Sequence, residues 1–296
     1  MLKTNADKLV KISVWGEVVS PIFVSEMSPY RISYDGRAIA LPGMGGITYN
    51  VRVGDLATGW EADHVEPGVS LENKEKDEKA PAAYNMALNL LACVGNEAKV
   101  VSGDAKGEKG VVTGKHGGIN HVMVDFREET LEKLVLKDKV QIKAWGMGLK
   151  LLDLPAVKVM NMDPDFMRTV NPSIENGKLV VPVSHVVPAA TMGSGLGVDQ
   201  VYSGDYDIQL FDKETVKQHG LEDLRLGDLV AILDADHSFG RIYKKGAVSV
   251  GIVVHTDCVI SGHGPGVTSL FTSSEGMITP KLDGKANIAA LLKLRG

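Results

Sequence analysis

The chain contains two similar segments of thirteen residues. Two segments this similar are expected to have similar backbone geometry. Residues 52–64 read RVGDLATGWEADH and residues 225–237 read RLGDLVAILDADH, so that seven of the thirteen positions are identical. In each copy Gly-Asp is typical of a tight turn, the apolar residues that follow are typical of a short strand, and Ala-Asp-His ends the copy. The repeat therefore predicts that a carboxylate and an imidazole lie twice at the end of a strand, held by a sheet and accessible from a loop.

A second pair of similar segments limits how much of this repeat is functional. Residues 131–142 and 221–232 share the pattern L-E-x-L-x-L-x-D-x-V-x-I, which predicts a helical turn, a tight corner and a strand. Only the later segment continues into Asp-His. The turn and strand are therefore interpreted as architecture, and the Asp-His end as the part that carries function.

The composition predicts the fold class. Glycine accounts for 33 of the 296 residues and aromatic residues for 5%, which indicates many tight turns. Short apolar runs separate these turns. We expect a mainly β fold with a few short helices, built from several small barrel-like or sandwich-like β modules.

Three parts are expected along the chain. Residues 1–95 are predicted to form an N-terminal β segment with one helix, and residues 151–296 the principal β domain with a C-terminal helix. Between them, residues 96–150 are predicted to form a small β barrel. The run KGEKGVV at 106–112 resembles the SH3-like barrels of ribosomal and transcription proteins.

Charge and cysteine content restrict the partners and the compartment. The net charge of −5 is the wrong sign for a protein that neutralises phosphates, so we expect a small-molecule ligand and no nucleic acid. Cys93 and Cys258 match no close-spaced zinc or redox pattern, which favours a reducing compartment. The most apolar segment, 80–95, is too short and too polar to span a bilayer. We expect a cytoplasmic protein with no membrane partner, and a homo-oligomer whose subunits cover exposed sheet edges.

Four of the eight histidines lie beside acidic residues or glycines, where they could bind a metal ion or take part in catalysis. We predict that His237, His255 and His263 hold a divalent ion, zinc or a similar metal, because imidazole suits such ions and antiparallel strands would bring the groups together. Asp236 and His64 are predicted to be catalytic. The other histidines are expected to be structural or solvent-facing: His116, His121, His185 and His219.

A glycine-rich loop surrounds His263. The sequence GHGPG at 262–266 predicts backbone N–H groups that bind an anion or an oxyanion, with an ordinary tight turn as the alternative. The run SGDYD at 203–207 carries two carboxylates that could serve as acid, base or ion ligands, or form a turn. The residues predicted to bind the ligand are Arg241, Gly262, Gly264, Gly266 and Asp205.

Several of these segments together resemble a bacterial and archaeal family that is known as a domain of unknown function. The resemblance extends along nearly the whole chain and implies a mainly β fold of several modules, without established catalytic residues. The segments that carry it are 62–70 (ADHVEPGVS), 192–197 (MGSGLG), 203–207 (SGDYD), 235–241 (ADHSFGR) and 261–266 (SGHGPG).

A shorter part of the chain is similar to the acetamidase/formamidase family of mainly β amidohydrolases. In that family a glycine-rich run with Asp precedes a strand, as SGDYDIQ does at 203–209. This chain departs from the family pattern after Gly227 and Asp228, where DADH replaces an acidic-glycine signature. The likeness implies amide hydrolysis, and the departure places that activity in question.

These residues favour a metal-assisted hydrolase that acts on a small polar, amide-like substrate. In this hypothesis Asp236 orients a metal ligand or acts as the base, and the backbone of 262–266 stabilises negative charge. The alternative is a non-catalytic β protein that binds a small molecule or acts as a scaffold, because a repeated turn and strand require no chemistry to explain them.

Overall fold

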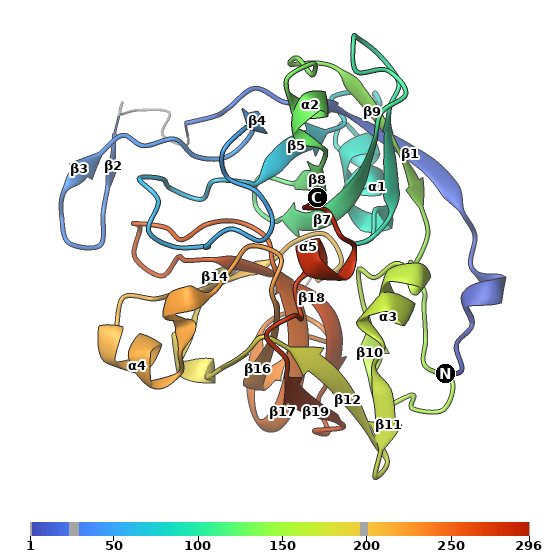
Figure 1. The fold of residues 1–296 in the computed structure, drawn as a ribbon, viewed down its shortest axis with the longest axis vertical. Helices are drawn as coiled ribbons and strands as arrows, with labels where there is room; N and C mark the ends of the chain where they lie inside the picture. Colours follow the sequence, from blue (N-terminus) through green and yellow to red (C-terminus); the bar gives the residue numbers. More distant parts are fainter. Residues whose placement is uncertain (1, 24–29, 196–200, 296) are drawn as a thin grey trace.

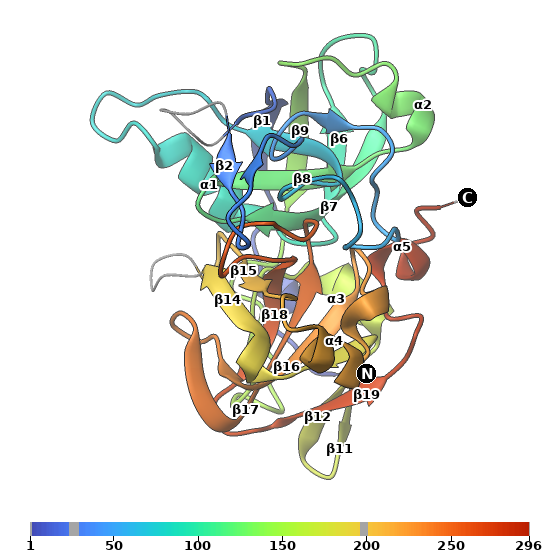
Figure 2. The ribbon, with the colours of Figure 1, turned by 90° about the vertical axis from the view of Figure 1, so that its left-hand side faces the viewer.

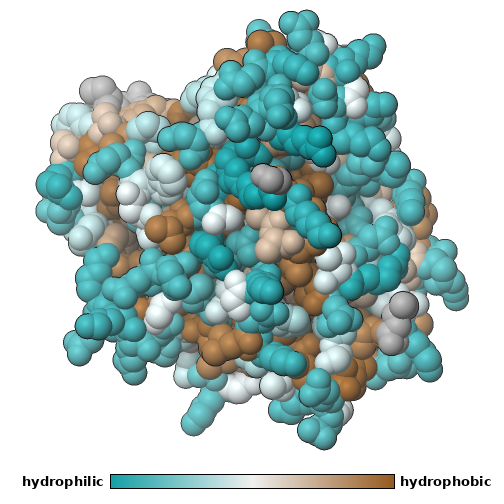
Figure 3. Space-filling view, viewed as in Figure 1, coloured by the Kyte–Doolittle hydropathy of each residue, from teal (hydrophilic) through white to brown (hydrophobic). Residues whose placement is uncertain are grey.

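The computed structural model describes residues 2–23, 30–195 and 201–295, and it confirms the mainly β fold. Figure 1 shows two β bodies, with the first half of the chain in the upper one and most of the second half in the lower one. Figure 2 shows the same division from the side. On the face seen in Figure 3, hydrophobic residues are scattered among hydrophilic ones.

The upper body is a barrel, because its first strand pairs with strands at both ends of the sheet. The strand order is β1-β9-β6-β7-β8-β5, with β4 beyond β5, and β1 closes the barrel by pairing with β5 at Glu17–Glu72 and Val18–Leu71. Buried and exposed residues alternate along β9, as expected for strands with one face in a core. The strands are β1 (Ile12–Val18), β4 (Ile47–Thr48), β5 (Gly68–Glu72), β6 (Glu97–Val100), β7 (Lys109–His116), β8 (His121–Asp125) and β9 (Lys139–Ala144).

The barrel takes strands from both sides of residue 95. The strands of the predicted SH3-like module, β6 to β9, are completed by β1 and β5, which come from the predicted N-terminal segment. The helix α1 (Ala83–Leu91) packs on this barrel, where Leu88 approaches Gly16 so closely that a Cβ atom on Gly16 would lie 2.9 Å from it. The helix α2 (Glu128–Leu131) follows β8.

The lower body is an open sheet with an apolar cluster on each side. Its order is β13-β16-β17-β18-β15-β14, and β10 also pairs with β18. A small sheet, β11-β12-β19, and the hairpin β2-β3 complete the described strands. The strands are β2 (Arg31–Ile32), β3 (Ala38–Ile39), β10 (Lys158–Val159), β11 (Ser173–Glu175), β12 (Lys178–Val183), β13 (His185–Val187), β14 (Met192–Gly195), β15 (Tyr206–Ile208), β16 (Leu229–Asp236), β17 (Ile242–Val253), β18 (Gly266–Ser273) and β19 (Ile278–Leu282).

The helices of the lower body are short. They are α3 (Pro164–Val170), α4 (Lys213–Gln218) and α5 (Ile288–Leu291). Asp163 caps α3 by accepting hydrogen bonds from the N–H groups of Asp165 and Phe166, as helix N-termini require. Across the described part of the chain, no helix combines the length and apolar character that a membrane crossing requires.

The first residues of the two repeat copies lie against each other. Gly54 N donates to Leu226 O at 2.7 Å, and Ala57 N donates to Leu224 O at 2.8 Å. The copies then diverge, because the second continues as β16, whereas residues 57–64 of the first are a loop. Common geometry is therefore limited to the beginning of the repeat.

One turn occurs three times and explains the similarity among the segments. The backbone N–H donates to an Asp three positions later, from Arg52 to Asp55 at 2.7 Å, and from Arg225 to Asp228 at 2.9 Å. The third pair is Val135 and Asp138 at 3.0 Å. In each turn the residue before the aspartate has a positive φ, which favours glycine: Gly54, Gly227 and, in the third turn, Lys137. The repeated pattern is thus a way of starting a strand.

A buried ion pair ties the first repeat copy to the barrel. Arg52 Nε donates to Asp125 Oδ1 at 2.9 Å, and Arg52 also donates to the carbonyl of Phe126. Both side chains of the pair are at most 7% exposed. A partner removed from such a pair leaves the other charge buried without compensation.

We expect Asp125→Ala to lower the free energy of unfolding by roughly 3 kcal/mol, because the guanidinium of Arg52 stays buried without its carboxylate. Glu97→Ala is the control, since Glu97 pairs with Lys109 on the surface and its loss is expected to cost less than about 0.5 kcal/mol. Urea unfolding of the three proteins measures both values. Equal effects for the two variants would contradict the role assigned to the buried pair.

Candidate metal centre

Histidines and carboxylates from both bodies meet where the barrel faces the open sheet. His116 ends β7 and His121 begins β8, directly opposite each other in the pairing of these strands. The remaining members come from loops and from the sheet below: Asp63, His64 and Glu66 before β5, Asp205 and Asp207 around β15, His255 after β17, and His263 before β18.

Backbone hydrogen bonds hold these segments together. Val65 N donates to Thr256 Oγ1 at 2.9 Å, and Thr256 N donates to Val65 O at 3.0 Å. On the other side of the site, Gly117 N donates to Asp205 Oδ1 at 2.7 Å. The barrel loops are therefore fixed to the segments that carry His255 and Asp205.

Three imidazoles are anchored through Nδ1. His64 Nδ1 lies 3.0 Å from Asp63 Oδ1, and His116 Nδ1 lies 2.7 Å from Glu66 Oε1. His255 Nδ1 lies 2.8 Å from the carbonyl oxygen of Thr256. Because ionised carboxylates and carbonyls only accept hydrogen bonds, each Nδ1 carries a proton, and each Nε2 is left to face the site. Metal-bound histidines usually have this arrangement, with the second ring nitrogen donating to a carboxylate or a carbonyl.

His255 Nε2 faces two carboxylates deep in the site. It lies 2.9 Å from Asp205 Oδ2 and 3.4 Å from Asp207 Oδ1. Both His255 Nε2 and Asp205 Oδ2 are buried without a hydrogen-bond partner. Burial alone would lower the pKa of His255, but Asp205 and Asp207 outweigh burial and raise this pKa well above its ordinary value. A proton or a metal cation is needed between these groups.

A second set of donors lies beside the first and nearer to solvent. His263 Nδ1 is 2.9 Å from Asp207 Oδ2 and 3.2 Å from His64 Nε2. Burial lowers the pKa of His64 to about 4, so its imidazole is neutral at pH 7. The side chain of His263 is 32% exposed, whereas those of His64 and Asp207 are 6% and 7% exposed.

Two carboxylates support the site from behind the imidazoles. Burial raises the pKa of Glu66, but His121 and His116 outweigh burial and hold this pKa well below its ordinary value. Asp63 accepts from Arg31 Nη1 at 2.6 Å and from the thiol of Cys258 at 2.9 Å, besides His64. Burial opposes its ionisation, but these partners hold its pKa at about 2.

Gly266 packs directly against the centre of the site. A Cβ atom at this position would overlap both Asp205 Oδ2 and His255 Nε2. The close approach of these two atoms therefore requires a residue without a side chain.

Three groups of side chains in the described part of the chain place one ligand atom each within 4.8 Å of the others. They are His116, Asp205 and His255; His64, Asp207 and His263; and Asp63, His64 and Cys258. In the third group, Asp63 is already bonded to Arg31, and burial and Asp63 raise the pKa of the Cys258 thiol, so that it stays protonated. We interpret the third group as support for His64, and the first two as donor sets for metal.

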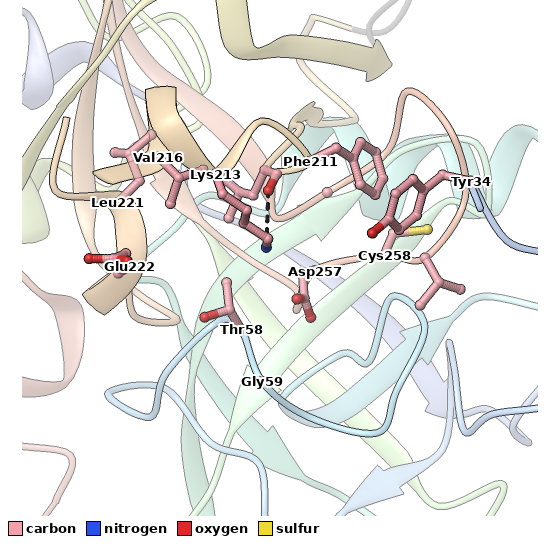
Figure 4. A pocket seen from close by; sticks show the side chains of 13 residues that line it. Tyr34, Thr58, Gly59, Phe211, Lys213, Val216, Leu221, Glu222, Asp257 and Cys258 are labelled. Atoms are coloured by element: carbon pink, nitrogen blue, oxygen red, sulfur yellow. Dashed lines mark hydrogen bonds between the residues drawn. The ribbon is translucent and has the colours of Figure 1, made fainter. Parts of the chain in front are cut away.

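Figure 4 shows a pocket of about 370 Å³ beside this cluster. The rings of Tyr34 and Phe211, with centroids 4.3 Å apart, form one side of it. Lys213 and Asp257 line it, and burial raises the pKa of Asp257 to about 6. Cys258 joins the pocket wall to the cluster through its hydrogen bond to Asp63.

The structure brings together four of the histidine and aspartate residues to which the sequence assigned a role. His64, His255, His263 and Asp205 lie in the cluster, and Gly266 borders it. Gly262 and Gly264 pack by backbone against β14 and β15: Gly262 O accepts from Ser194 N at 2.6 Å, and a Cβ atom on Gly264 would overlap Ile208 O.

The other three predicted site residues lie in different surroundings. His237 Nδ1 is 2.7 Å from Tyr206 Oη and 3.0 Å from Ser269 Oγ, and His237 belongs to none of the donor groups among described residues. Asp236 accepts from Ser238 N at 2.9 Å in a turn, and Arg241 is exposed. Of the glycine-rich run at 192–197, positions 196 and 197 lie outside the described residues.

Three members of the cluster had no assigned functional role in the sequence analysis: Glu66, His116 and His121. Asp207 was one of the two carboxylates of the run SGDYD that could serve as acid, base or ion ligands. The expectation that His116 is solvent-facing is wrong, because it is 6% exposed and bound to Glu66. A signal was present in the run HGGINH at 116–121, where a glycine turn places two histidines opposite each other across a hairpin.

Comparison with known proteins identifies a family and no activity. A family model described as a domain of unknown function, DUF4438 N-terminal, matches residues 30–168, and the model of its C-terminal domain matches residues 169–292. A solved structure, described as the crystal structure of TM1086, is 50% identical with a TM-score of 0.90, and the match covers 97% of this chain and 98% of that chain. No curated protein matches the chain. The resemblance to a family of unknown function is confirmed, and the likeness to acetamidases is not shown.

The environment of His237 predicts a pH dependence of stability. Burial, followed by the charge of Arg241, lowers its pKa to about 3, below the ordinary value of 6.5. Between these values the unfolded chain binds a proton that the folded chain does not, so stability is present above pH 6.5 and is lost as the pH falls. From pH 7 to pH 5 this residue should remove about 2 kcal/mol from the free energy of unfolding.

His237→Asn keeps an acceptor for Tyr206 and does not titrate in this range. Its free energy of unfolding should therefore fall by about 2 kcal/mol less than that of the wild type between pH 7 and pH 5. Urea unfolding in the presence of a chelator measures the difference. The contributions of all other histidines are common to both proteins and cancel in the comparison. Parallel pH dependences would mean that His237 is protonated in the folded protein.

Proposed function

The chain belongs to the DUF4438 family, a domain of unknown function, so its activity has to be inferred from its own site, and we propose that it is a metal-dependent hydrolase of a small polar substrate. One observation carries the proposal. His255 Nε2 and Asp205 Oδ2 are buried and 2.9 Å apart, yet neither makes a hydrogen bond, and they lie among further imidazoles whose Nδ1 atoms are anchored away from the centre.

The donor atoms favour a transition-metal ion. Imidazole nitrogens together with carboxylate oxygens suit zinc, manganese, iron and similar divalent ions, whereas magnesium and calcium prefer oxygen ligands alone. The carboxylates of Asp63 and Glu66 raise the basicity of His64 and His116 and fix their orientation. The residues present therefore fit a divalent ion such as zinc.

A divalent ion in this cluster would act as a Lewis acid on a substrate carbonyl and lower the pKa of a water molecule. The chain's own residues supply the approach to it. His263 is the partly exposed donor, and Gly264, the next residue, lines the pocket in Figure 4. A substrate in the pocket would therefore reach the cluster from the side of His263.

The pocket supports a small polar substrate with an apolar part. Lys213 offers a cation, Asp257 offers a carboxyl group, and the rings of Tyr34 and Phe211 offer apolar area. A carbonyl compound such as an amide, with one charged group for Lys213, matches this lining. Hydrolysis of that bond is the reaction that we assign to the site.

A structural metal site is the second candidate, because the donors come from both bodies and an ion would fasten them together. Structural sites are closed by protein ligands, whereas catalytic sites keep an open position. The partial exposure of His263 favours the open type. Metal removal separates the two candidates, since a structural ion would be needed for folding at ordinary temperature.

We expect protein purified without a chelator to carry a transition metal, and His255→Ala and Asp205→Asn to lose most of it together with activity. Removing a direct ligand should lower metal affinity by at least the roughly 10- to 100-fold that supporting residues contribute. Elemental analysis and hydrolysis of a panel of small amides measure the two effects. His219→Ala is the control, because His219 is exposed at the end of α4.

The proposal fails if the wild type, expressed with added zinc or manganese, contains no metal above the level of a metal-free control protein. It also fails if His255→Ala keeps the full metal content. Metal content without turnover of any amide, combined with a large fall in melting temperature on chelation, would favour the structural candidate.

Gly266→Ala tests the space between the ligands without removing any of them. We expect the added methyl group to separate Asp205 from His255 and to lower metal content at least as strongly as Asp205→Asn. Gly284→Ala is the matched control, because nothing lies within 4 Å of a Cβ atom there. Equal metal contents for the two variants would show that the gap is not used.

A further inference from the structure

We propose that the centre holds two divalent ions that share the carboxylate of Asp207. This inference rests on the metal-dependent function proposed above and specifies the machinery of that site. The inner ion would be bound by His116, Asp205 and His255, and the outer ion by His64 and His263, with Asp207 between them.

The two donor sets are complete and adjacent. Each has three side chains of the described chain whose ligand atoms lie within 4.8 Å of one another. The ring of His255 lies 4.3 Å from that of His116 in the inner set and 5.1 Å from that of His64 in the outer set, measured between centroids. Two ions so placed would be neighbours, as in hydrolytic sites whose ions are roughly 3.5–4 Å apart.

The orientation of Asp207 connects the sets. Its Oδ2 lies 2.9 Å from His263 Nδ1 and 4.0 Å from His64 Nε2, whereas its Oδ1 lies 3.4 Å from His255 Nε2. One oxygen therefore faces the outer donors and the other faces the inner donors. A carboxylate in this position can bridge two ions.

The donor atoms of the outer set also face one another at distances that an ion could bridge. His64 Nδ1 donates to Asp63, so His64 Nε2 is a lone pair, and it faces His263 Nδ1 at 3.2 Å. His263 Nδ1 also faces Asp207 Oδ2. Either a proton on His263 or an ion satisfies both contacts. An ion here would have the same types of ligand as the inner ion, namely two imidazoles and a carboxylate.

Charge and burial make the two positions unequal. Asp63 is compensated by Arg31, and Glu66 lies against His121 and His116. Asp205 and Asp207 remain, and one divalent ion neutralises them. The second ion binds with a net positive charge at a partly exposed position, so it should bind more weakly than the first.

The outer ion would lie beside the pocket. His263 precedes Gly264 of the pocket lining, and Cys258 of the pocket wall bonds to Asp63 behind His64. The outer ion would therefore position the substrate, while the buried ion stays in place.

Metal-free protein titrated with Mn²⁺ provides the test. We expect calorimetry and elemental analysis after gel filtration to give two ions per chain, with the second at least about 10-fold weaker, and electron paramagnetic resonance to show spin coupling between them. His263→Ala should bind one ion per chain and lose the coupling. His219→Ala should bind two and keep it, and circular dichroism confirms that each variant is folded.

The possible outcomes distinguish the two-ion centre from the proposed hydrolase function. One ion per chain in the wild type, with amide turnover intact, would overturn the two-ion centre but not the proposed hydrolase function. Two ions retained by folded His263→Ala would also overturn it. Two coupled ions without turnover of any substrate would support this centre and contradict hydrolysis, and absence of Mn²⁺ binding would overturn both.

Discussion

A buried imidazole that faces buried carboxylates is the constraint around which this molecule is arranged. His255 is fully buried and Asp205 is 4% exposed, so the contact between them is cut off from water. A charge at such depth is costly unless it is paired, and the groups that face His255 Nε2 are the carboxylates of Asp205 and Asp207. Thr256 fixes the ring through Nδ1, and Gly266 supplies no side chain. The contact between barrel and sheet is therefore built around a position that either a proton or a metal cation fills.

Much of this could be predicted from the sequence where local patterns decide the outcome. Glycine content and short apolar runs predicted the mainly β fold, and the neighbours of His255 and His263 marked the loops that carry donors. Barrel closure could not be predicted, because it depends on pairing between β1 and β5, which no local pattern encodes. For the same reason the strands on either side of residue 95 belong to one sheet.

The repeat shows why identical motifs have different outcomes. Both copies end in Ala-Asp-His, yet His64 joins the cluster and His237 is enclosed by Tyr206 and Ser269. The difference comes from the residues before the motif: the apolar run of the second copy continues as β16, whereas the first contains Thr-Gly-Trp and forms a loop. A strand delivers its last residues into its own sheet, but a loop can carry them to another body. Motif identity therefore predicted chemistry at one copy only.

His116 and His121 illustrate the opposite case, in which residues in apolar strands join the cluster through a shared partner. They face each other across the β7–β8 hairpin, and Glu66, from a separate loop, binds both. This carboxylate keeps its charge in spite of complete burial because two imidazoles stabilise it. The arrangement orients His116 before any ligand arrives, so an ion would bind without reorganising the ring. Preorganisation of this kind requires the barrel to be closed. The site between barrel and sheet therefore depends on strands that come from distant parts of the chain.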